Sequence, residues 1–250
     1  MTARGKPVSR AGRRRTRADP GEGAELGPAQ GPGLPRQSGP DGDEHRRLLQ
    51  VLADAQRAGV LGAAAVEQHV EHAAGFLVAL EPSAFANATV LDLGSGAGIP
   101  GLVIAQCCPS ARVVLLEGST VRAARLQRSV RYLGLDRRVD VVARRAEEAG
   151  RDPSLRGRFD VVVARGFASP GPTAECAAGL LRVGGRLVVS EPPEAAEGDG
   201  RWDGDGLGAL GMRLESRHAI PWHFAVIRQD SSCPPRYPRR VGVPAKRPLF

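Results

Sequence analysis

Apolar positions divide the 250-residue chain into segments of different character. Residues 1–42 are rich in Arg, Gly and Pro and contain few large apolar side chains. They cannot bury enough surface to offset the entropy of ordering, so we expect a disordered basic extension. Residues 43–87 repeat apolar side chains at helical spacing, which predicts N-terminal helices, the second over residues 62–80.

From residue 88 the period changes, and short apolar runs alternate with helical stretches. Continuous apolar strands joined by helices are typical of a parallel sheet covered on both faces, so residues 88–232 predict a doubly wound α/β domain. A Gly-rich mobile loop and a C-terminal antiparallel hairpin should complete it, before a tail at residues 233–250. The expected strands are 88–93, 112–117, 139–143, 159–164, 185–190, 212–220 and 222–228; the helices are 100–107, 120–133 and 173–181; the loop is 191–211.

The net charge of +8 is concentrated at the two ends of the chain. Residues 1–50 have a net charge of +4, with seven bases and no acid in residues 1–18, and residues 233–250 carry five bases and no acid; residues 51–232 are nearly neutral, at −1. Basic ends indicate a polyanionic partner, nucleic acid ahead of membrane. We find neither an apolar run long enough to span a membrane nor a secretory h-region before Pro20, so we expect a cytoplasmic protein.

The four cysteines are Cys107, Cys108, Cys176 and Cys233. No two of them have C-x-x-C spacing, so the sequence predicts neither a zinc site nor a disulfide framework. Buried thiols in a reducing compartment fit this pattern.

The strongest local signal is VLDLGSGAGIPG, between a predicted strand and a predicted helix. Its glycines are Gly94, Gly96, Gly98 and Gly101. The last three alone satisfy the G-x-G-x-x-G pattern of NAD-binding oxidoreductases. Asp92 at the strand end favours a different ligand, because a carboxylate there repels a pyrophosphate and attracts a cation. The ammonium group of S-adenosylmethionine, held directly or through water, is such a cation.

Two later strand ends carry residues suited to a nucleoside. Glu117 ends the next strand, where an acid can accept hydrogen bonds from both ribose hydroxyls. Ala146 and Glu147 follow the third strand, where their backbone can bind an adenine. The acids in that turn also suit a helix N-terminus.

Together the stretches DLGSGAGIPG, LLE, RAEE and FDVVVARGFAS, with the closing RYPRRVGVPAKRPLF, resemble the glucose-inhibited division protein B family. The resemblance covers about residues 44–250. It implies a Rossmann-like class I methyltransferase fold with a mostly parallel sheet. It also implies methylation of N7 of a guanine in 16S ribosomal RNA by S-adenosylmethionine, with that RNA or the small ribosomal subunit as partner. We expect a monomer that needs no metal.

The resemblance also assigns residues. It places Gly94 and Ile99 at the methionine part of the cofactor and Ala146 and Glu147 beside the adenine. It places Arg165 at the cofactor carboxylate or at an RNA phosphate. No catalytic base is expected, because guanine N7 already offers a lone pair. The expected RNA contacts are Arg122, Arg236, Tyr237, Arg239, Arg240, Lys246 and Arg247.

The chain departs from the family pattern at three places on the expected RNA side. Val121 stands where the family has a lysine before its arginine, Glu191-Pro192 replaces Lys-Gly, and the motif His-x-x-Asp-Ser becomes residues 69–73, His-Val-Glu-His-Ala. Another RNA target or a small-molecule methyltransferase therefore remains an alternative. An NAD-dependent oxidoreductase and a non-catalytic RNA-binding relative are further alternatives, which cofactor binding would distinguish.

Overall fold

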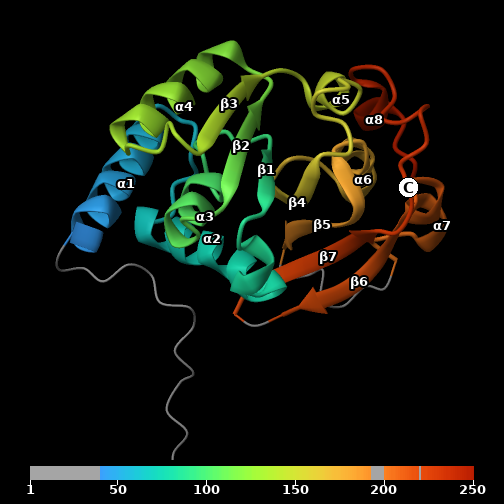
Figure 1. Cartoon of the computed structure of the whole chain (residues 1–250), viewed down its shortest axis with the longest axis horizontal. Helices are drawn as coiled ribbons and strands as arrows, with labels where there is room; N and C mark the ends of the chain where they lie inside the picture. The colour runs from blue at the N-terminus through green and yellow to red at the C-terminus, as the bar shows by residue number, and fades with distance from the viewer. Residues whose placement is uncertain (1–39, 193–199, 220) are drawn as a thin grey trace, which may run out of the picture. The chain divides into compact units, whose positions relative to one another are not determined.

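A seven-stranded sheet forms the centre of the computed structural model, which describes residues 40–192, 200–219 and 221–250 (Figure 1). The strand order is β3-β2-β1-β4-β5-β7-β6. The first five strands pair in parallel, whereas β7 is antiparallel to both β5 and β6. The predicted doubly wound sheet with a C-terminal hairpin is thus confirmed. The strands are β1 (Thr89–Leu93), β2 (Arg112–Glu117), β3 (Val139–Ala143), β4 (Phe159–Ala164), β5 (Leu181–Glu191), β6 (Met212–His218) and β7 (His223–Gln229).

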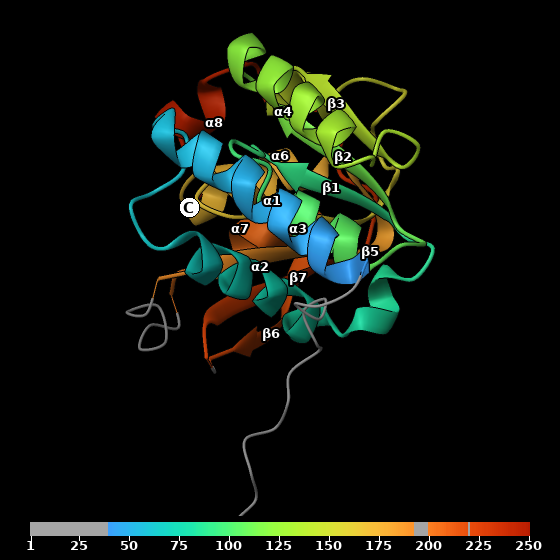
Figure 2. The same ribbon diagram turned by 90° about the vertical axis from the view of Figure 1, so that its left-hand side faces the viewer.

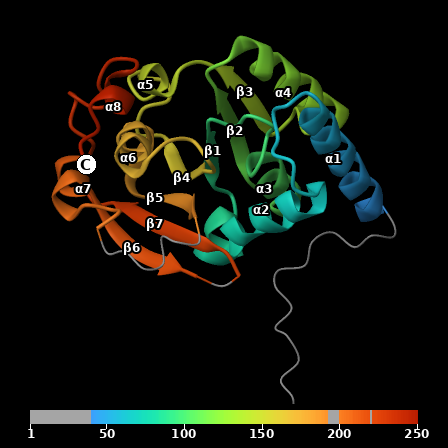
Figure 3. The ribbon, with the colours of Figure 1, turned by 180° about the vertical axis from the view of Figure 1, so that it is seen from behind.

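Helices cover both faces of the sheet. Figure 1 shows α1 to α4 on one side of it and α5 to α8 on the other, and Figure 3 shows the same division from behind. In Figure 2, α1 and α3 lie in front of the sheet. The helices are α1 (Pro40–Arg57), α2 (Val66–Leu80), η1 (Pro82–Phe85), α3 (Gly101–Cys107), α4 (Thr120–Tyr132), α5 (Ala146–Ala149), α6 (Pro170–Ala178), α7 (Gly204–Ala209) and α8 (Val243–Lys246). None of the described helices is long and apolar enough to cross a membrane.

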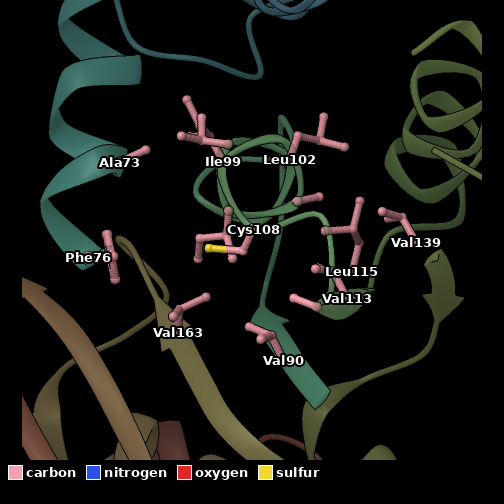
Figure 4. Packing of buried hydrophobic residues seen from close by; sticks show 14 of the residues in the cluster. Ala73, Phe76, Val90, Ile99, Leu102, Cys108, Val113, Leu115, Val139 and Val163 are labelled. Carbon is pink, nitrogen blue, oxygen red and sulfur yellow. The ribbon is translucent and has the colours of Figure 1, made fainter. Parts of the chain in front are cut away.

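Alternation along each strand divides the core into two layers. Val90 of β1 points to the layer that contains Phe76 of α2 and Leu102 of α3 (Figure 4). The next residue, Leu91, points to the opposite layer, which α6 and α7 cover. Because successive strand residues face opposite sides, a continuous apolar run fills both layers. This explains why the strands could be predicted as uninterrupted apolar segments.

One predicted loop is wrong over part of its length. Residues 193–199 lie outside the described residues, but residues 204–209 form α7. Asp203 caps this helix by accepting a hydrogen bond from the backbone of Gly206 at 2.6 Å, and Leu207 is buried. Glycine lowers helix propensity, so the sequence GDGLGA does not predict a helix. The burial of Leu207 in the core stabilises the helix instead.

The N-terminal extension predicted for residues 1–42 lies outside the described residues as far as residue 39. Helix α1 begins at Pro40, three residues before the predicted boundary. Its apolar side packs into the same layer as α2 and α3. The N-terminal helices therefore share a core with the sheet.

Candidate functional site

The carboxyl ends of β1, β2 and β4 open into a cavity of about 500 Å³. In an open α/β sheet this edge binds ligands, at the point where the strand order reverses. Loops after four strands line the cavity, together with the loop between α1 and α2 and helix α8. The cavity brings together most of the residues predicted for cofactor binding, namely Gly94, Gly96, Ile99, Glu117, Ala146, Glu147 and Arg165.

The loop after β1 is tied to the neighbouring strand and to the loop after β4. The backbone N–H groups of Gly94 and Ser95 both donate to the carbonyl of Leu116, at 2.9 and 3.0 Å. Gly94 has φ +73°, and a Cβ there would lie 2.6 Å from the ring of Phe167. Only glycine satisfies both requirements. Gly94 therefore lets the two loops meet at the cavity wall.

Asp92 lies beneath this loop and is not among the residues that line the cavity. It is 1% exposed, and its Oδ2 accepts a hydrogen bond from the backbone N–H of Gly101 at 3.0 Å. Burial raises its pKa to about 7, although the hydrogen bond from Gly101 opposes that rise. Gly98 does not line the cavity either, and a Cβ there would meet Leu102 at 2.5 Å. Both residues shape the loop, and a direct contact of either with a cofactor stays a prediction.

Glu117 is a buried carboxylate on the cavity wall with three donors around it. Its Oε1 accepts from the backbone of Ser119 and from Nη2 of Arg122, both at 2.8 Å, and its Oε2 accepts from the backbone of Gly96 at 3.0 Å. Burial raises its pKa, but these hydrogen bonds outweigh that effect and hold the pKa below its ordinary value. A carboxylate has about four acceptor positions. Glu117 therefore stays charged and keeps one acceptor on Oε2 for a ligand hydroxyl.

The opposite wall of the cavity joins the turn after β3 to the C-terminal tail. Ala146 and Glu147 begin α5, as the acids of that turn suggested, and both line the cavity. Oε1 of Glu147 accepts a hydrogen bond from the backbone N–H of Gly242 at 2.9 Å. Pro244 and Ala245 of α8 also line the cavity. Sequence reasoning missed this role of the tail, which it assigned to RNA alone.

Hydrogen bonds from two arginines outside the tail hold it in place. Arg156 donates to the carbonyls of Cys233 and Tyr237, each at 2.8 Å. Arg151 donates to the carbonyl of Pro238 at 2.6 Å. Tyr237 itself is only 8% exposed. Residues 233–250 are therefore a fixed part of the fold.

The five bases of the tail differ in their surroundings. Arg239 donates from Nε and Nη2 to the carboxylate of Glu175, which is fully buried. This ion pair and a hydrogen bond to the carbonyl of Arg247 occupy three of its five N–H donors, so an RNA contact by Arg239 stays a prediction. The guanidinium of Arg236 lies 5.0 Å from the centre of the Tyr237 ring. The bases of the tail that remain exposed are Arg236, Arg240, Lys246 and Arg247.

Arg165 follows β4 and reaches the cavity from the side of α2. Its Nη1 lies 3.3 Å from Nδ1 of His69. Burial lowers the pKa of Arg165, and the charge of Asp92 partly restores it. The neighbouring His72 has its pKa lowered to about 4 by burial and by the positive charge of Arg165. His72 is therefore neutral near pH 7, and Arg165 supplies the positive charge here.

The cavity has a basic rim that sequence reasoning found only in part. Arg122 and Arg165 were predicted, whereas Arg144 and Arg145 were not; all four line the cavity. Their position directly after β3, at the same edge of the sheet, was the available signal. Among the described residues, no group of three His, Cys, Asp or Glu could hold a metal ion.

The strand order and the cavity at its switch point are those of the class I methyltransferase fold. A putative O-methyltransferase from Klebsiella pneumoniae superposes with a TM-score of 0.52 at 18% identity, covering 74% of this chain and 90% of that one. The O-methyltransferase from Bacillus cereus in complex with SAH gives 0.52 at 16% identity, covering 74% and 91%. At these identities the likeness concerns the fold.

Sequence relatives are more specific. The family model of rRNA small subunit methyltransferase G (GidB) matches residues 46–195. The ribosomal RNA small subunit methyltransferase G of Rubrobacter xylanophilus is 36% identical over 213 residues, 80% of each chain. That of Pelotomaculum thermopropionicum is 36% identical over 191 residues, 73% of this chain and 79% of that one. The chain belongs to the rRNA small subunit methyltransferase G family, which confirms the resemblance seen in its motifs.

Proposed function

We propose that this protein transfers the methyl group of S-adenosylmethionine to N7 of a guanine in the 16S RNA of the small ribosomal subunit. Family membership supports the reaction. The observation that carries the proposal is one cavity that combines a charged acceptor, Glu117, with a rim of four arginines. The acceptor suits a nucleoside, and the rim suits a polyanion.

The nucleoside half of the cofactor fits the wall between β2 and α5. The spare acceptor on Oε2 of Glu117 would take a hydrogen bond from a ribose hydroxyl, and release of the half-exposed Arg122 would free a second acceptor. The backbone of Ala146 and Glu147 would hold the adenine edge. The contact between Gly242 and Glu147 fixes that wall before any ligand arrives.

The amino-acid half fits the wall between β1 and β4. Gly94 and Ile99 line this part, and Arg165 carries the charge that would pair with a carboxylate. Because Asp92 lies below the loop, it acts on this region by holding the first turn of α3 at Gly101.

The reaction needs no general acid or base from the protein. S-adenosylmethionine supplies a methyl group activated by its sulfonium charge, and guanine N7 has a free lone pair. The residues of the site therefore work by holding N7 in line with the methyl group at near-attack distance. The exposed arginines at the rim, with the exposed bases of the tail, would neutralise RNA phosphates and orient the substrate.

Ribosomal RNA from strains with and without the gene tests the proposal. Borohydride reduction and aniline cleavage break RNA at N7-methylguanine, so we expect one cleavage in 16S RNA that disappears with the gene. The enzyme would act where ribosomes assemble, in the cytoplasm. An unchanged cleavage pattern would contradict the ribosomal target.

Complementation adds a matched control. Glu117→Gln removes the charged acceptor and should not restore the cleavage. Glu148→Gln changes an exposed acid in the nearby turn that does not line the cavity, and it should restore the cleavage in full.

A further inference from the structure

A second cavity, of about 280 Å³, adjoins the first. The two share three consecutive residues after β4, Gly166, Phe167 and Ala168. The far side of the second cavity is formed by Glu191 at the end of β5 and by Trp202. A flat molecule placed across Phe167 could therefore reach both cavities at once.

Glu191 places a buried negative charge in this second cavity. Its side chain is 4% exposed. One oxygen, Oε1, accepts hydrogen bonds from Nε1 of Trp202 at 2.8 Å and from Nε of Arg201 at 3.0 Å. No hydrogen bond among the described residues uses the other oxygen, Oε2. Because Glu191 lines the cavity, this oxygen is an available acceptor there, and the cavity suits a ligand that brings a hydrogen-bond donor.

The walls of the second cavity narrow the choice of ligand. Phe167 and Trp202 are aromatic, and bases extruded from a nucleic acid stack on such side chains and are identified by hydrogen bonds at their edges. Guanine carries an amino group at C2, at the opposite end of the purine from N7. Adenine and hypoxanthine have no donor at that position. An acceptor facing C2 therefore distinguishes guanine from both.

We propose that the second cavity holds the six-membered ring of the target guanine and that Oε2 of Glu191 accepts a hydrogen bond from its 2-amino group. This inference rests on the proposed function, because N7 must then lie toward the first cavity. Phe167, on the boundary between the two cavities, is the stacking surface. Glu191 is a specificity-determining residue that this chain has where the family resemblance led us to expect lysine.

The test is a double-mutant cycle between the side chain and the base. Small-subunit RNA is made by splint ligation with either guanosine or inosine at the position mapped by aniline cleavage, and kcat/KM for methyl transfer is measured. Inosine keeps N7 and lacks only the 2-amino group. We expect the wild-type protein to prefer guanosine by about 10- to 100-fold. Glu191→Ala should lower this ratio to about 1, and the isosteric Glu191→Gln should give an intermediate ratio because a neutral acceptor binds more weakly.

Asp205→Asn is the matched control, because it neutralises an exposed acid on α7 that lines neither cavity; it should keep the wild-type ratio. Calorimetry with S-adenosylmethionine should give the same affinity for every variant, which shows that each has folded. The inference is overturned if the wild-type ratio is near 1 or if Glu191→Ala and Glu191→Gln both keep the full ratio. A wild-type protein that methylates neither RNA would instead contradict the proposed function.

Discussion

Arg239 forms a two-pronged ion pair with Glu175, 64 residues away in the sequence. The nitrogen–oxygen distances are 2.9 and 2.6 Å, and the backbone N–H of Arg239 donates to the same carboxylate at 2.7 Å. The side chain of Glu175 is fully buried within α6. The tail that completes the cavity wall is thus anchored to the core by an ion pair with a buried acid.

Removing the arginine should destabilise the fold. In Arg239→Met the buried Glu175 loses its main donors. Removing one partner of a buried ion pair lowers the unfolding free energy by at least about 3 kcal/mol. We expect a loss near this lower value, because Arg239 is partly exposed. Urea unfolding followed by circular dichroism measures this loss. The exposed neighbour Arg240→Met should change stability by less than about 0.5 kcal/mol. Equal losses in the two variants would show that the ion pair does not anchor the tail.

The exposed tail bases should act on RNA and leave the cofactor alone. Replacing Arg236, Arg240, Lys246 and Arg247 by glutamine should reduce the slope of log affinity against log salt by up to about 3, since each phosphate contact contributes roughly 0.7 to 0.9. Filter binding of small-subunit RNA over a salt series gives the slope. S-adenosylmethionine affinity should stay unchanged in the same protein. A slope equal to that of the wild type would show that these side chains contact no phosphate.

Glu117→Gln should weaken cofactor binding and preserve the fold. The substitution keeps the volume but removes a charged acceptor, and hydrogen bonds to charged groups contribute about 1.5 to 3 kcal/mol, which corresponds to roughly 10- to 100-fold in the dissociation constant. Titration calorimetry with S-adenosylmethionine measures the change. Glu148→Gln, on the exposed side of α5, should match the wild type. An unaltered affinity in Glu117→Gln would remove Glu117 from the site.

Local patterns predicted most of the fold because they depend on neighbouring residues. The apolar run of β1 and the glycines after it determine their own conformation, and the acid of Glu117 falls at a strand end whatever the tertiary packing. The contact of Gly242 with Glu147 joins positions 95 residues apart, so no local sequence pattern predicts it. Helix α7 likewise depends on the burial of Leu207 against the sheet.

The tail shows the same limit for function. Its charge predicted an RNA-binding segment, and charge alone does not distinguish an exposed base such as Arg240 from one that balances a buried acid, as Arg239 does. The sequence also did not predict that Asp92 lies beneath the loop and outside the cavity. A residue two places before a glycine can face either the ligand or the helix behind the loop.

Asp92→Asn should change how stability depends on pH. Burial raises the pKa of Asp92 from 3.8 to about 7, so between about pH 4 and pH 7 the folded protein holds a proton that the unfolded chain has lost. This group therefore lowers the unfolding free energy as pH rises through that window. Asparagine still accepts the hydrogen bond from Gly101 but does not titrate, so the variant should gain about 1 kcal/mol or more relative to the wild type between pH 4 and pH 7. Urea unfolding across this range measures the difference, with the exposed Asp140→Asn as control. Parallel stability curves for Asp92→Asn and the wild type would mean that Asp92 is charged in the folded protein throughout, as a carboxylate in direct contact with a cationic ligand would be.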